Sequence, residues 1–158
     1  MKKFVRILLV IILCLVLVAI YFPDWFSFGY RYENAGRYTT GNCTMNEKVD
    51  TIDVNWIAGE VNIVLHDGNE IKLTESADRS LKKDEQVHWL LDDNTLYVKY
   101  MRSGRISASN MNKELTLYLP DDMSLDDVRI SCVSASVEAE LPEAEDVRLE
   151  NVSGKTDL

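Results

Sequence analysis

The chain has 158 residues, which is room for one folded domain after its apolar N-terminus, since domains usually contain about 100 to 200 residues. Its formal charge is -9, and the 26 Asp and Glu outnumber the 17 Lys and Arg. Binding a phosphate backbone requires a positive surface, so this acidic balance excludes nucleic acid as a partner.

The N-terminus predicts one membrane-spanning helix. Lys2, Lys3 and Arg6 precede an uncharged run from Ile7 to Phe22. The run is somewhat shorter than the roughly 20 residues of an untilted span, but the aromatic residues that follow can extend it. The positive flank should stay in the cytoplasm, which places the rest of the chain outside. We therefore expect a single-pass protein of the cell membrane, with residues 1–28 as basic tip and anchor.

Aromatic residues gather at the end of this run, as is typical of a membrane interface. They are Tyr21, Phe22, Trp25, Phe26, Phe28, Tyr30 and Tyr32. A cleaved signal peptide is the alternative, but Ala19 lacks the small residue that cleavage needs two positions earlier. Cys14 is interpreted as an apolar residue of the helix. Residues 29–49 are expected to form a linker and residues 50–158 an extracytoplasmic β domain.

Beyond the linker, short segments rich in Val, Ile, Leu, Tyr and Thr alternate apolar with polar residues and predict strands. They are Thr51–Ile63, Glu70–Thr74, Val87–Leu91, Leu96–Tyr100 and Leu115–Leu119. Turn residues at 66–69 and 92–94 predict two hairpins. We expect loops at 76–85 and 102–112, and Pro120 should end the last of these strands.

The C-terminal third contains a repeat: residues 127–139 match residues 146–158, and a weaker copy spans 52–63. Small residues at 134–135 and 153–154 would let each copy bend, and stacked copies would share a core. The pattern therefore predicts an all-β, β-solenoid or β-helix-like stack of short strands with hairpins. An ordinary β-sandwich remains the alternative; a leucine-rich repeat lacks its helical return here. The expected inward residues are Val128, Ile130, Val133, Val137 and Ala139.

Charged residues of the repeat are expected to face outward. Asp127, Arg129, Arg148 and Glu150 are the candidate interaction surface, and stacking should place Arg129 diagonal to Asp146. Each such pair would contribute only a few tenths of a kcal/mol. The chain stops in mid-repeat, so we expect either a fragment that lacks further repeats or an edge covered by another chain.

No catalytic, cofactor or metal site is expected. His66 and His88, the two histidines, lack the short ligand spacing of a metal site. Glu138 and Glu140 share one strand face at a separation near the lower limit for inverting glycosidases, which leaves a glycan-active enzyme as a less favoured alternative. Cys43 and Cys132 could form a disulfide outside the membrane, or remain free thiols.

The anchor, the motif at 52–63, the strand Leu115–Leu119 with Pro120, and the Val152-Ser153-Gly154 corner together resemble the putative-adhesin family. These are domains of unknown function in envelope proteins of Gram-positive bacteria. The resemblance covers the chain beyond about residue 50 and implies a β-solenoid. The favoured function is a membrane-anchored scaffold that contacts cell-wall polymer, a host ligand or a membrane protein. An accessory role in envelope-stress signalling is the alternative.

Overall fold

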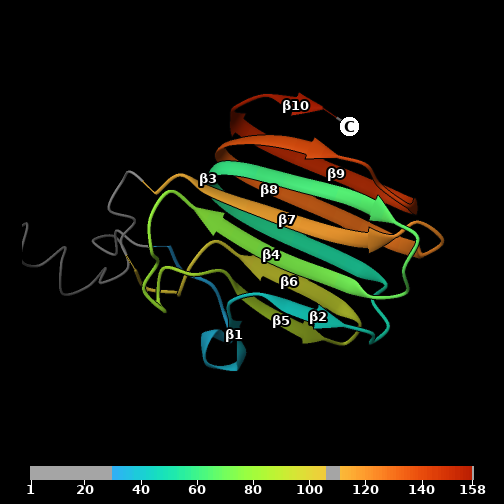
Figure 1. Ribbon diagram of the computed structural model, residues 1–158, viewed down its shortest axis with the longest axis horizontal. Helices are drawn as coiled ribbons and strands as arrows, with labels where there is room; N and C mark the ends of the chain where they lie inside the picture. Colours follow the sequence, from blue (N-terminus) through green and yellow to red (C-terminus); the bar gives the residue numbers. More distant parts are fainter. Residues whose placement is uncertain (1–29, 106–110, 158) are drawn as a thin grey trace, which may run out of the picture.

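A computed structural model describes residues 30–105 and 111–157. Apart from a short 3-10 turn (Ala35–Arg37), the regular elements of these residues are all strands, and they form one continuous, curled sheet (Figure 1). The strands are β1 (Thr39–Thr40), β2 (Cys43–Met45), β3 (Thr51–His66), β4 (Ile71–Ala77), β5 (His88–Asp92), β6 (Thr95–Lys99), β7 (Lys113–Pro120), β8 (Ser124–Ala139), β9 (Glu143–Ser153) and β10 (Thr156–Asp157).

Two long strands, β3 and β8, bend midway and so take part in two layers. The first half of β3 pairs in parallel with β6, and its second half pairs in parallel with β7. β8 follows β3 through both halves, from Thr51 opposite Asp127 to Ile63 opposite Ala139. Figure 1 shows the two layers one behind the other, with β7, β4 and β2 in the nearer one. The apolar residues of both layers face each other and form the core.

The predicted repeat is confirmed as a stack. β9 lies beside β8 in parallel, with Asp127 opposite Asp146 and Ile130 opposite Leu149. β10 continues the same register along the second half of β8, with Thr156 opposite Val137. The weaker copy at 52–63 is the β3 rung that stacks on β8 from the other side. Each rung therefore covers the apolar face of the next, as the sequence pattern predicted.

The bend of each rung requires a small residue. At the β3 bend, Gly59 has φ +98°, and a Cβ there would lie 2.0 Å from the backbone oxygen of Lys113. In the last rung, Gly154 has φ +145°, and a Cβ there would meet the backbone oxygen of Ala135 at the same distance. Glycine is tolerated at both places because it has no side chain and readily adopts positive φ.

Four of the five residues expected to point inward do so, but Val133 does not. Val128, Ile130, Val137 and Ala139 are buried, whereas Val133 is 53% exposed and Cys132 takes the inward position. At the bend the chain turns from one layer to the other, so two consecutive side chains, Val133 and Ser134, lie on its outer side. The strict alternation of a straight strand fails there.

Val133→Asp is consequently expected to be tolerated, with a change in the free energy of unfolding within about 0.5 kcal/mol, as for most exposed positions. Ile130→Asp, three residues earlier and 1% exposed, should prevent folding because a charge would be buried without a partner. Thermal unfolding of the two variants, followed by circular dichroism, checks this contrast. Equal destabilisation by both would show that Val133 does lie in the core.

Of the two expected hairpins, one is confirmed and one is wrong. β5 and β6 pair antiparallel around Asp93 and Asn94, both with positive φ. β3 and β4 are joined by the turn at 67–70 but do not pair, because β7 lies between them. The turn sequence determined that the chain reverses there. It did not determine which strand fills the space between the two arms.

Residues 30–49, expected within a linker, belong to the domain. β1 pairs with β5 and β2 with β4, while Met45 and Val49 are buried in the core. Tyr30 and Tyr32, expected in a membrane-interface collar, also pack on the fold. The Tyr30 hydroxyl donates to the backbone oxygen of Asn55 at 3.2 Å. The start of residues 30–49 therefore packs on the sheet, because Tyr30 and Tyr32 make contacts there.

Within residues 30–105 and 111–157, no helix is long and apolar enough to cross a membrane. The predicted transmembrane helix falls in residues 1–28, outside the described part of the chain.

Candidate functional site

The four residues predicted as an interaction surface lie together on the outer face of β8 and β9. Arg129 is directly opposite Arg148 in the neighbouring rung. Arg129, Arg148 and Glu150 are exposed, and Asp127 is half-buried. The Arg129 guanidinium bonds to the Asp127 carboxylate of its own strand, whereas the sequence suggested a diagonal partner, Asp146, in the next rung.

This outer face continues onto β3 and β6. Asp53 lies opposite Arg129 across the β3–β8 pairing, and the ammonium of Lys99 on β6 is 2.9 Å from the Asp53 carboxylate. Lys99 itself is buried, so the exposed or half-buried charges of both signs lie on three adjacent strands, β3, β8 and β9. We call the outward residues Asp53, Asp127, Arg129, Arg148 and Glu150 the charged ladder. Such an open, regular surface suits an extended polar partner better than a small molecule, which needs a concave site.

A buried ion pair lies beneath the opposite layer. Lys113, the first residue of β7, is 1% exposed, and its Nζ is 2.6 Å from Oε1 of Glu75 on β4. The same ammonium lies 4.1 Å from the Tyr100 ring centroid and 5.0 Å from that of Trp56. It also donates to the backbone oxygen of Glu85 at 2.7 Å. Burial lowers the pKa of Lys113 and raises that of Glu75. No substrate could reach an ammonium enclosed in this way, so the pair is structural.

A second carboxylate, that of Glu85, holds the loop at 78–87 in place beside this ion pair. The Glu85 side chain accepts from Arg79 at 3.0 Å, from Arg105 at 2.8 Å and from the backbone N–H of Lys82 at 2.9 Å. The bond from Arg79 is the main cause that lowers the pKa of Glu85 from 4.5 to about 2. Ionised Glu85 thus ties two loops together at one end of the fold.

We expect acid to remove this contribution. Because the folded-state pKa of Glu85 is depressed, its stabilisation is fully present above the ordinary value of 4.5 and is lost as the pH falls toward about 2. Thermal unfolding measured across this interval should show a steeper loss of stability in the natural protein than in Glu85→Gln. Parallel pH profiles of the two proteins would contradict the assignment.

His88 lines a polar groove of about 470 Å³, together with Ala35, Tyr38, Thr40, Lys83, Asp84 and Arg102. Its Nδ1 is 2.9 Å from the backbone oxygen of Gln86, which can only accept, so Nδ1 carries the proton and Nε2 accepts from the Thr40 hydroxyl at 3.3 Å. Burial lowers the pKa of His88. The imidazole is only 5% exposed and both of its nitrogens are hydrogen-bonded, so it packs the fold.

The two glutamates of the enzyme alternative are both exposed at the end of β8. Glu138 borders an open groove of about 490 Å³ with Glu60, Asn62, Ser136, Val137, Lys155, Thr156 and Asp157. None of these residues is aromatic, so the groove has no platform on which a sugar ring could stack. The geometry gives no support to glycan hydrolysis.

Both described cysteines are free thiols. Cys43 on β2 and Cys132 on β8 are separated in the sheet by β4, β7 and β3, so the disulfide left open by the sequence is not formed. Burial raises the pKa of each thiol to about 11. Among the described residues, no three His, Cys, Asp or Glu side chains converge as metal ligands.

Sequence reasoning missed the Lys113 cluster, although a signal for it exists. Lys113 precedes Leu115, Leu117 and Leu119 in the same alternating phase, and all four are buried. Extending that phase two residues toward the N-terminus would have predicted an inward lysine, which requires a buried acidic partner. Identifying Glu75 as that partner required the β4–β7 pairing.

The fold and its surface define a class: an all-β domain of stacked, parallel rungs. It presents charged residues on its outer face, and its buried charged groups form structural ion pairs. Within this class the chain belongs to the Toastrack DUF4097 family, whose pattern matches residues 49–158. The expected resemblance to an adhesin-like domain of unknown function is thereby confirmed.

Two solved structures are similar. A putative cell adhesion protein from Clostridium sporogenes has 13% identity and a TM-score of 0.43, over 72% of this chain and 57% of its own. A putative adhesin from Bacteroides fragilis has 12% identity and a TM-score of 0.37, over 76% of this chain and 62% of its own. The chain thus spans less than two thirds of either protein. No curated protein matches it significantly.

Proposed function

We propose that this protein is a membrane-anchored, extracytoplasmic scaffold of the bacterial cell envelope that binds an extended polar partner through its β rungs. It uses no cofactor and catalyses no reaction. The observation that carries the proposal is the charged ladder: a regular, open surface across three strands, β3, β8 and β9, whose rungs lie in continuous register. The uncharged run Ile7–Phe22, behind three basic residues, supplies the anchor.

The charge distribution favours a partner that offers both signs. Arg129 lies opposite Arg148, with the acidic pair Asp127 and Asp146 on one side and Glu150, opposite Ser131, on the other. Cell-wall polymers with phosphate and amine groups, or the polar surface of a neighbouring membrane protein, have this chemistry. The acidic remainder of the domain disfavours nucleic acid.

Binding of the full-length protein to purified cell wall, measured by co-sedimentation, tests the proposal. Arg129→Glu together with Arg148→Glu should abolish retention, because the cationic row becomes acidic. Lys72→Glu on the outer face of β4, which is also exposed, serves as the matched control and should retain binding. Equal retention of all three proteins would rule out the ladder as the binding surface.

The anchor is tested separately. In membranes from expressing cells, the protein should resist alkaline extraction, and protease added to spheroplasts should cleave the C-terminal domain. Release by alkali would contradict anchoring.

Crosslinking in the same membranes distinguishes the alternative role, since capture of a sensor kinase in place of wall polymer would favour an accessory of envelope-stress signalling.

A further inference from the structure

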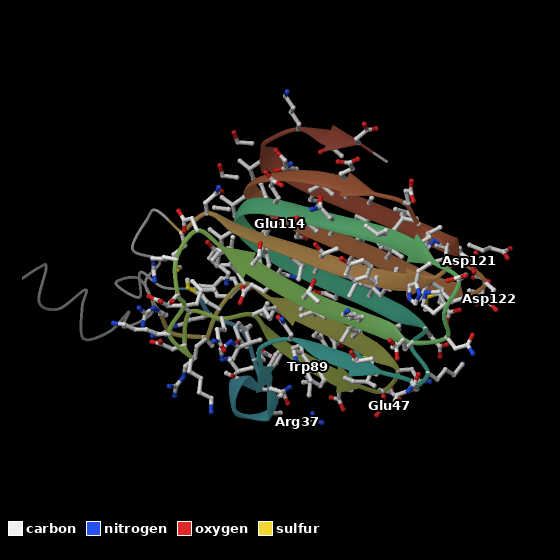
Figure 2. All side chains as sticks on the ribbon, viewed as in Figure 1. Arg37, Glu47, Trp89, Glu114, Asp121 and Asp122 are labelled. Atoms are coloured by element: carbon white, nitrogen blue, oxygen red, sulfur yellow. The ribbon has the colours of Figure 1, made fainter. Side chains whose placement is uncertain are left out.

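The two ends of the β stack differ in charge and polarity. The bends of β3, β8 and the last rung lie at one end, together with the loops at 30–34, 78–85 and 101–105. We call this the bend end. The turns at 46–50, 67–70, 92–94, 121–126 and 140–143 lie at the other, which we call the acidic end. Figure 2 shows Asp121 and Asp122 there, beyond the arrowheads of β3 and β7.

Charge separates strongly along this axis. The five turns of the acidic end contain 11 acidic residues and one basic residue, Lys48. The three loops of the bend end contain six basic residues and four acidic ones. Two of those four acids, Asp84 and Glu85, are engaged by Arg105. The exposed cations of the bend end therefore stand out on an otherwise acidic domain.

Exposed apolar side chains lie at the same end. Val133 is 53% exposed and Val152 is 83% exposed, at equivalent positions of neighbouring rungs. Ile57, the equivalent residue of the β3 rung, is half-buried beside them. Together they form an apolar ridge along the outside of the bends. At this exposure Val152 contributes little to the core, so the ridge is open to an apolar partner.

The described chain also starts at this end. Tyr30 bridges to Arg105: its backbone N–H donates to the Arg105 oxygen at 3.1 Å, and its own oxygen accepts from Gly104 at 2.7 Å. The start of the domain is thereby fixed within the basic loops. In the proposed function, the segment that immediately precedes Tyr30 is embedded in the membrane.

We propose that the bend end is a lipid-contacting surface, in which Lys82, Lys83 and Arg102 bind the phosphates of anionic headgroups and the Val133–Val152 ridge enters the interface. This inference rests on the proposed membrane anchor. Each Lys or Arg near an anionic leaflet adds a favourable electrostatic contribution, and apolar side chains add the free energy of their burial. The same leaflet repels the acidic end. Both effects favour an orientation in which the bend end faces the membrane and the acidic end points away from it.

Full-length protein in nanodiscs provides the test. An environment-sensitive fluorophore is attached through Val152→Cys at neutral pH, where the two described native thiols, with pKa about 11, form far less of the reactive thiolate than an exposed cysteine does. Cys14 is replaced by Ser to leave one reactive site. Asp67→Cys, exposed in a turn of the acidic end, is the matched control.

In nanodiscs that contain phosphatidylglycerol, the probe at 152 should shift to the blue and be quenched by nitroxide lipids, whereas the probe at 67 should do neither. High salt, or nanodiscs of phosphatidylcholine alone, should reverse much of this effect because the headgroup attraction is electrostatic. The combined variant Lys82→Glu, Lys83→Glu and Arg102→Glu should behave like the natural chain in phosphatidylcholine. Within residues 30–105 and 111–157, the ion pairs of this end use Arg79 and Arg105, so the three substitutions break none of them.

The outcomes separate the two proposals. Protein that enters anionic nanodiscs while its probe at 152 remains in water would overturn the lipid-contacting surface and leave the anchor intact. Protein that never co-purifies with nanodiscs would overturn the anchor, and this inference with it. A blue shift that survives in the triple variant would show that the cations of the bend end do not bind headgroups.

Discussion

Replacing Gly59 with alanine is expected to reduce the free energy of unfolding by at least about 3 kcal/mol. Two penalties combine there. The φ of +98° is unfavourable for any residue with a side chain, and the added Cβ would lie 2.0 Å from the backbone oxygen of Lys113. That oxygen belongs to the start of β7, so relief of the contact would separate β7 from β3. Thermal unfolding of the full-length protein in detergent, followed by circular dichroism, measures the loss.

Two other glycines separate these penalties. Gly104 has φ +83°, but no described atom lies within 4 Å of the place that an added Cβ would take. Gly104→Ala therefore reports backbone strain alone, at about 1 kcal/mol. Gly36 has neither feature, and Gly36→Ala should be nearly neutral. If Gly59→Ala costs no more than Gly104→Ala, the contact with Lys113 is not what restricts this position.

Replacing Lys113 with methionine is expected to cost about 3 to 5 kcal/mol, although the two side chains are similar in size. The loss arises because Glu75 would remain buried without its cation, with one carboxylate oxygen still accepting from the Val87 N–H at 3.0 Å. Adding Glu75→Gln should restore most of the stability, since the amide oxygen can keep that bond and no charge is left in the core. Thermal unfolding of the single and double variants measures both effects.

The pH dependence provides an independent check on this pair. Burial already raises the pKa of Glu75, and loss of Lys113 removes the charge that opposes this shift. A raised folded-state pKa stabilises below the unfolded value and loses that effect as the pH rises. Lys113→Met should therefore become more stable, relative to the natural protein, as the pH is lowered toward the ordinary range of a carboxyl group. A constant difference at every pH would contradict the role of Glu75.

The sequence contained the information for the stack because its evidence is local and repeated. Residues 127–139 and 146–158 share one pattern of apolar spacing, and the structure pairs them in that register. Strand positions from β3 to β7 were also predictable, since side chains of a half-buried strand alternate between core and solvent. The four outward residues of the repeat followed from the same alternation.

Contacts between distant segments lay beyond this evidence. Nothing near His66 indicates that β7, about fifty residues later in the chain, lies between β3 and β4. The orientation of Val133 depends on where β8 bends. β8 follows the bend of β3, and that bend lies where the Lys113 backbone approaches Gly59. Lys113 is stable in the core only because Glu75 meets it there.

The sequence by itself thus determined the all-β class, the repeat and its register, since the alternation of apolar and polar residues is a pattern of neighbouring positions. The tertiary structure alone decided the strand order, the buried ion pair and the separation of basic loops and exposed valines from the acidic turns. These features depend on which remote segments meet, and that is settled by the packing of the whole sheet and not by any local pattern.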